Sequence, residues 1–248
     1  MTDNLLNLNL RHQELVRENG YAMWNPITTK VSWAPKRTAL VLCDIWDSHW
    51  CRGAVERLNA MTPQMNEVAL ACRSNGVLIV HAPSSTLDFY ADTPVRKRTE
   101  SLPLVETPRE LELPDPPLPV DASDHGADTG EQKPHSAWTR QHPDILIDQD
   151  RDLMSDDGEQ IYTCFQHYRI QNMLIMGVHT NMCILHRSFG IKQMVRWGLS
   201  VALVRDLTDI MYNPAMSPYV SHDDGTRLVV SFIEQHWCPT VKSSNLLS

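Results

Sequence analysis

The chain has 248 residues, of which 42% are apolar and 21% charged, close to the globular average, which excludes a disordered or fibrous chain. Its net charge of −8, from 22 basic and 30 acidic side chains, argues against a nucleic-acid partner, because phosphate binding draws on a basic surface. No apolar run approaches the roughly 18 residues of a membrane helix, and the polar start lacks the pattern of a secretory leader, so we expect a cytoplasmic protein with no membrane partner.

The polar segment 1–37, interrupted by aromatic residues and prolines, is interpreted as an N-terminal arm: a short helix, then an extended stretch laid over the domain. From residue 38 to 248, apolar runs alternate with stretches of helical periodicity. The apolar runs predict strands at 38–43, 76–82, 144–147, 172–178, 199–205 and 239–243. The periodic stretches predict helices at 62–74, 159–168, 183–197 and 225–236. This alternation indicates βαβ units and an α/β domain with a mainly parallel, doubly wound sheet.

A long insertion separates the second and third predicted strands, at about 83–143. It is rich in proline between 102 and 119 and then in Asp, Gly and His. A structureless stretch of this length in a compact domain is a functional loop or a solvated insertion. Because it follows the carboxyl end of a strand, where open α/β sheets hold their ligands, a cap over the active site is one interpretation, and a solvated insertion is the other.

The segment GVHTNMC, which ends at Cys183, lies between the fourth predicted strand and the next helix. A cysteine in the first turn of a helix has its thiol pKa lowered by the helix dipole and the free N–H groups. The same N–H groups can hold an oxyanion. A buried, inert cysteine is the alternative, but the position and the flanking pattern favour a reactive thiol.

The second informative segment, CDIWDSHWC, follows the first predicted strand. Asp44 comes directly after a buried run, where a carboxylate is costly unless it serves as a base, ion-pair partner or cap. We expect it to converge with Cys183, because the first and fourth strands meet at a switch point. A metal-dependent enzyme using Asp44, His49 and His81 is an alternative, but one Asp-x-His pair on a loop is weak evidence for a metal.

Four further side chains are candidates for substrate binding: Trp46, His49, Trp138 and Arg140. The first two follow Asp44, and the last two lie just before the third predicted strand. An arginine with an aromatic neighbour can hold a substrate carboxylate. Packing of the cap onto the sheet explains the aromatic residues equally well.

The early strand-Asp and the G-V-x-T-N-x-C block resemble the isochorismatase-like cysteine hydrolases, which are nicotinamidase-related amidohydrolases, over residues 36–243. The resemblance implies a three-layer Rossmann-like fold with a six-stranded sheet and helices on both faces, assembled as a dimer or tetramer. It implies Cys183 as nucleophile, Asp44 as catalytic aspartate and a cis peptide at Val178–His179. The N–H groups of His179 and Cys183 would form the oxyanion hole, and a small amide would be hydrolysed through a thioester, with no cofactor.

Two departures from the family pattern bear on the chemistry. The family's catalytic lysine, expected at the end of the third strand, is missing: the window reads Asp-Gln-Asp-Arg-Asp over 148–152, so the position falls to Asp148, Asp150 or Arg151, of which we expect the acid Asp150. The Asp-x-His pair that binds a metal in nicotinamidases is replaced by His-Ala-Pro at 81–83, so no metal is expected.

These observations predict a cysteine-dependent hydrolase that cleaves a C–N bond in a small amide, carbamoyl or ureido compound. The missing lysine leaves a second hypothesis, a non-catalytic relative that binds a small ligand in the same pocket. The sequence does not name the substrate, because the insertion that sets specificity carries no recognisable motif.

Overall fold

The computed structural model describes residues 5–247, which form an eight-stranded sheet. The parallel part of the sheet contains β3 (Thr38–Cys43), β4 (Leu78–Ala82), β5 (Leu153–Met154), β6 (Asn172–Val178), β7 (Ser200–Asp209) and β8 (Thr240–Val241). At one edge β1 (Leu6–Glu18) and β2 (Tyr21–Trp33) pair antiparallel, giving the order β2-β1-β8-β7-β6-β3-β4-β5. The predicted α/β class and parallel core are confirmed, and the N-terminal pair takes the strand count beyond the predicted six.

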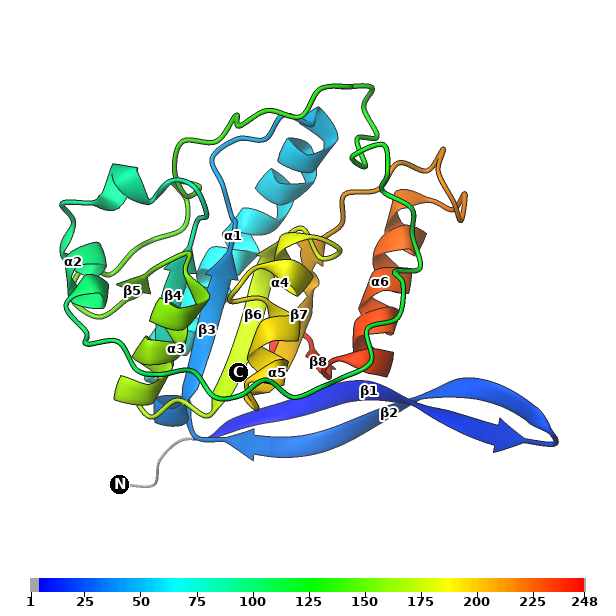
Figure 1. The fold of residues 1–248 in the computed structure, drawn as a ribbon, viewed down its shortest axis with the longest axis horizontal. Coiled ribbons are helices and arrows are strands. Elements are labelled where there is room, and N and C mark those ends of the chain that lie inside the picture. The colour runs from blue at the N-terminus through cyan, green and yellow to red at the C-terminus, as the bar shows by residue number, and fades with distance from the viewer. Residues whose placement is uncertain (1–4, 248) are drawn as a thin grey trace.

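Helices cover both faces of this sheet (Figure 1). One face carries α1 (Arg52–Ser74), and the other carries α3 (Gly158–His167), α4 (Cys183–His186), α5 (Ile191–Arg196) and α6 (His222–His236). The shorter elements are α2 (Pro94–Glu100) beside β5, η1 (Pro35–Arg37), η2 (Leu87–Tyr90) and η3 (Ser243–Asn245). Within residues 5–247, no helix combines the length and apolarity needed to cross a membrane.

The central strand β3 is buried along its whole length. Its side chains alternate between two cores: Ala39 and Val41 face the side of α3–α6, while Leu40 and Leu42 face α1. A strand covered on both faces has a continuous apolar sequence. This explains why the predicted bounds of β3 and β6 agree with those in the structure.

Two predicted elements are wrong in position. The third parallel strand is β5, whereas residues 144–147 form no strand; a strand of two residues has no periodicity to detect. The first long helix begins at Arg52 rather than at residue 62, so that Pro63 lies inside it and not at its start. Proline leaves the Asn59 carbonyl without an amide partner, and the Thr62 hydroxyl donates to that oxygen at 3.0 Å instead.

The N-terminal arm contains a two-stranded ribbon and not the expected short helix. Leu6, Leu8 and Leu10 are buried while the asparagines between them are exposed, which is the two-residue period of a strand. Figure 1 shows the far half of the ribbon projecting past α6.

The insertion is fixed to the domain at several points. After α2, the chain passes beside α5, where the Leu111 N–H donates to the Arg196 carbonyl at 2.9 Å. It then crosses the carboxyl ends of the strands (Figure 1). On its return, the Thr139 N–H donates to the Asp47 carboxylate at 2.9 Å. The insertion is therefore tied to the domain by backbone and side-chain hydrogen bonds along its course, and whether it caps a site stays a prediction.

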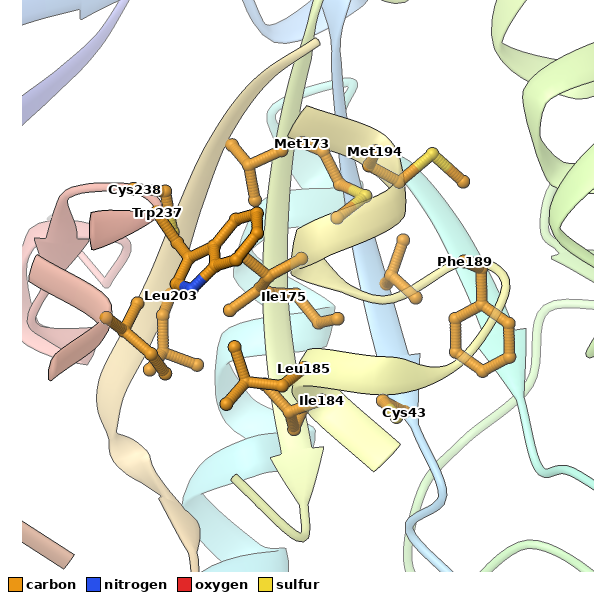
Figure 2. Close-up of a cluster of buried hydrophobic side chains, with 14 of the residues drawn as sticks. Cys43, Met173, Ile175, Ile184, Leu185, Phe189, Met194, Leu203, Trp237 and Cys238 are labelled. Carbon is orange, nitrogen blue, oxygen red and sulfur yellow. The ribbon is translucent and has the colours of Figure 1, made fainter. Parts of the chain in front are cut away.

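Figure 2 shows the core that holds the end of β6 in place. Ile184 and Leu185 of α4 pack beside Ile175 of β6, and Cys43 lies at the end of the neighbouring strand β3. The short helix is therefore anchored by its apolar side chains, and its first residue is positioned at the carboxyl end of the sheet.

We predict that Gly177→Ala lowers the free energy of unfolding by roughly 3 kcal/mol or more. Gly177 has φ +126°, and a Cβ there would lie 1.9 Å from the Cys43 carbonyl oxygen, so β3 and β6 would have to separate. Urea unfolding followed by circular dichroism measures the change. The control is Gly198→Ala, which shares a positive φ of +82° but meets no atom within 4 Å and is expected to cost about 1 kcal/mol. Equal costs for both variants would contradict the close approach of the strands.

Candidate active site

Asp44 is a fully buried carboxylate directly after β3. Its backbone has φ +49°, and its N–H donates to the Ala82 carbonyl at 3.0 Å, which turns the chain out of the sheet. One carboxylate oxygen accepts the Ser84 N–H at 2.8 Å, and the other accepts Nε of Arg187 at 3.0 Å. These partners offset the cost of burying the charge.

Cys183 is the first residue of α4 and the only one of the six cysteines that is not buried. Its thiol lies beside the Asp44 carboxylate, close enough for the two groups to shift each other's pKa. Burial and the negative charge of Asp44 raise the pKa of the Cys183 thiol to about 12. The expected lowering by a helix dipole is wrong, because α4 is a single turn of four residues and the carboxylate outweighs it.

Burial also raises the pKa of Asp44, and the positive charge of Arg187 opposes that rise. The thiol pKa of about 12 keeps the proton on sulfur at neutral pH, while the Arg187 guanidinium and the Ser84 N–H both favour the ionised form of Asp44. In this arrangement the thiol can act as a proton donor and the Asp44 carboxylate beside it as the proton acceptor.

Arg187 supplies the cation that the sequence pattern does not provide elsewhere. It directly follows α4, and its N–H donates to the Cys183 carbonyl at 3.0 Å, so the two side chains lie one helical turn apart. Burial lowers the pKa of Arg187, but Asp44 and Cys183 outweigh it and the pKa is raised. In the sequence, only the four-residue spacing between Cys183 and Arg187 could have indicated that this arginine lies beside the thiol.

The expectation that Asp150 takes the lysine position is wrong. The segment 148–152 precedes β5, and β5 pairs parallel with β4, so this segment lies toward the amino ends of the strands, away from Asp44. Asp150 is exposed, and Arg151 is paired with Asp148 at 2.6 Å. Arg151 also lines a cleft beside the start of β4, at this opposite end of the sheet.

The peptide between Val178 and His179 is cis, as the resemblance implies. The His179 N–H lies near the Cys183 sulfur and lowers the pKa of the thiol slightly, and neither this amide nor that of Cys183 donates to an oxygen anywhere in residues 5–247. Both amides thus lie at the Cys183 sulfur without an oxygen acceptor, an arrangement that can hold an oxyanion.

The turn between β6 and α4 is held by two polar side chains. The Thr180 N–H donates to the Asp209 carbonyl at 2.7 Å, and Asn181 exchanges hydrogen bonds of 2.8 and 2.9 Å with the backbone of Met211. The turn is therefore fixed to β7 and the residues after it, and the two amides keep their direction.

A charged network lies behind this turn and was not indicated by any sequence motif. Arg57 donates to Asp209 at 2.8 Å and to Asp128 at 2.6 Å, and Nε2 of His222 lies 2.9 Å from Asp209. Burial raises the pKa of Asp209, but His222 and Arg57 outweigh it and the pKa is lowered. The backbone carbonyl of Asp209 also accepts the Thr180 N–H. The network therefore links α1, α6 and the insertion to the turn between β6 and α4.

The four candidate substrate-binding residues lie where the last part of the insertion meets the loop after β3. Trp46 and Trp138 stack with ring centroids 4.2 Å apart, and the His49 ring lies 5.6 Å from that of Trp138. The indole nitrogen of Trp138 is buried without a hydrogen-bond partner in residues 5–247. Arg140 lies over the Phe89 ring at 5.5 Å. The aromatic residues thus join the cap to the loop after Asp44.

The metal alternative is not supported by the positions of its ligands. Nε2 of His81 lies 3.0 Å from Asp152 and Nδ1 lies 2.8 Å from Gln141, so both ring nitrogens are engaged. Nδ1 of His49 accepts the Cys51 N–H at 3.1 Å. In the described part of the chain, no three His, Cys, Asp or Glu side chains are grouped for a metal ion.

Comparison with known proteins gives matches in structure only. No family model and no curated protein sequence matches the chain. A cysteine hydrolase from Pseudomonas syringae pv. phaseolicola 1448A superposes with a TM-score of 0.54 at 14% identity, covering 86% of this chain and 92% of that chain. An isochorismatase from Pseudomonas putida KT2440 superposes with a TM-score of 0.51 at 10% identity, covering 85% and 90%. The chain has the isochorismatase-like hydrolase fold. The resemblance drawn from the GVHTNMC block is confirmed for the fold.

In this isochorismatase-like fold, we predict that Arg187→Gln slows alkylation of Cys183 roughly tenfold at a fixed alkaline pH. Loss of the cation raises the pKa of the thiol, so less thiolate is present. Iodoacetamide labelling followed by peptide mass spectrometry across pH measures the rate, and Arg187→Lys should retain most of it. Arg151→Ala removes an exposed arginine at the other end of the sheet and is the matched control. An unchanged rate in Arg187→Gln, or equal slowing in the control, would show that another cation serves the thiol.

Proposed function

We propose that the protein hydrolyses a C–N bond in a small amide, carbamoyl or ureido compound, with Cys183 as the nucleophile. The supporting observation is the meeting of three groups: a partly exposed cysteine, the buried Asp44 carboxylate beside its thiol, and the His179 amide, which donates to no oxygen in residues 5–247. A buried acid and an accessible thiol have little structural reason to occur together.

The proposed reaction starts when Asp44 takes the thiol proton as Sγ of Cys183 attacks the carbonyl carbon. The carbonyl oxygen becomes an oxyanion held by the amides of His179 and Cys183. Asp44 then gives its proton to the leaving nitrogen, the C–N bond breaks, and a thioester remains. Water attacks the thioester with Asp44 as base, which releases the acid product and returns the proton to sulfur.

Arg187 has an electrostatic role in this scheme. Its charge favours the ionised Asp44 at rest and the thiolate during attack. An arginine does not exchange protons at working pH, so all proton transfers fall to Asp44. The hypothesis of a non-catalytic relative rested on the missing lysine, and the presence of Arg187 beside both groups removes that support.

We expect Cys183→Ala to reduce ammonia release at least about 10³-fold, with Asp44→Asn comparably impaired, because both act in one unit. The assay is a panel of small amides and ureas, run with a strong chelator present. Cys72→Ala, a buried cysteine on α1, serves as the control and should keep full activity. Activity that persists in Cys183→Ala, or that zinc restores after chelation, would reject the thioester mechanism.

We also propose that the chain forms a homo-oligomer, a dimer or tetramer, through the β1–β2 ribbon. Three apolar side chains near its tip are exposed on 39–56% of their surface: Leu15, Met23 and Trp24. A two-stranded ribbon is marginally stable alone, so a second copy covering these side chains would stabilise it. Light scattering should show an assembly for the parent chain and a monomer for the triple variant Leu15→Ser/Met23→Ser/Trp24→Ser. A monomeric parent at micromolar concentration would exclude this assembly.

A further inference from the structure

The terminal nitrogens of Arg187 are the unexplained feature of the site. Only Nε contacts Asp44, at 3.0 Å, and neither Nη donates to an acceptor in residues 5–247. The side chain is exposed on 34% of its surface. A guanidinium has five donors, so an arginine serving Asp44 alone would leave most of them unused.

Arg187 lines an open concavity of about 420 Å³ that also reaches Cys183. Its lining residues are Asn181, Met182, Cys183, His186 and Arg187. Burial lowers the pKa of His186, which keeps that ring neutral at mildly alkaline pH. Arg187 is therefore the permanent cation of this lining.

The other basic side chains near this concavity already have partners. Lys192 pairs with Asp115 at 2.5 Å, and Arg196 pairs with the same carboxylate at 3.3 Å. Arg140 lies over Phe89 on the aromatic side of the site. An anion entering the concavity beside Cys183 would thus meet Arg187 first.

We propose that Arg187 binds a carboxylate of the substrate through its two terminal nitrogens, so that the substrate is a small acid amide or ureido acid. This inference rests on the proposed function and names its substrate class. The arginine fork matches a carboxylate with two parallel hydrogen bonds. Because Arg187 lies one helical turn from Cys183 and both line the same concavity, the carboxylate would be bound close to the scissile carbonyl.

The reaction itself strengthens this contact. At rest, Asp44 offsets the charge of Arg187. When Asp44 takes the thiol proton, it becomes neutral, and the guanidinium then faces only the substrate carboxylate and the oxyanion. The contact is therefore stronger in the transition state than in the ground state, which is the condition for it to accelerate the reaction.

Two alkylating agents of nearly equal size test the proposal without a known substrate. Iodoacetate carries a carboxylate bonded directly to the reacting carbon, and iodoacetamide is its neutral counterpart. In each case, the thiolate sulfur bonds to carbon and iodide leaves. The ratio of the two rates at Cys183, divided by the ratio for free glutathione, reports anion binding and does not depend on the thiol pKa.

We expect this normalised ratio to be at least about tenfold in the parent chain, intermediate in Arg187→Lys and about one in Arg187→Gln. The double variant Asp44→Asn/Arg187→Gln leaves no unpaired buried charge, so it covers the case in which Arg187→Gln fails to fold. Its ratio should also be about one. Arg151→Ala is the matched control and should keep the parent ratio.

A ratio of one in the parent chain overturns the proposal, as does a high ratio that survives in Arg187→Gln or is lost in Arg140→Gln instead. A paired hydrolysis assay separates this inference from the proposed function, using acid amides and their neutral diamide counterparts. Hydrolysis without preference for the acid, together with a flat alkylation ratio, rejects carboxylate binding and leaves the hydrolase. A high ratio that depends on Arg187, with no amide hydrolysed, retains the anion site and rejects the hydrolase.

Discussion

The ion pair between Asp44 and Arg187 is the contact on which the arrangement of this site depends. A carboxylate with no exposed surface is tolerated only when charge and hydrogen bonds compensate it, and Asp44 obtains both from Arg187 and the Ser84 amide. The partner comes from the segment that also carries Cys183. The pair therefore fixes the position of Cys183 beside Asp44 as well as neutralising the buried charge.

The sheet makes this pairing possible. β3 and β6 are adjacent and parallel, so Asp44 and the turn after β6 emerge at the same edge. Gly177 allows the two strands to approach closely at that edge, and the core contacts of Ile184 and Leu185 hold α4 down. The turn between β6 and α4 is thus supported on one side by apolar packing and on the other by hydrogen bonds to the segment around Asp209.

The site also keeps its charge balanced. At rest, one carboxylate, one guanidinium and a neutral thiol sum to zero, and moving the thiol proton to Asp44 conserves that sum. An arginine in place of a lysine makes this balance rigid, because it keeps its charge at working pH. The high pKa of the Cys183 thiol follows from the same arrangement, since the sulfur lies beside a carboxylate and is largely shielded from water although the residue is partly exposed.

The sequence by itself determined the parallel core, the junctions that carry Asp44 and Cys183, and the isochorismatase-like resemblance. Buried strands and the residues following them leave apolar runs and local motifs that can be read along the chain. The third member of the site was decided only by the tertiary structure. Lysine was sought at the end of the third strand, but β5 is too short to locate from its pattern, and the cation comes from Arg187 on the other side of the pocket. The course of the insertion and the N-terminal ribbon likewise depend on contacts between residues far apart in sequence, which no local periodicity encodes.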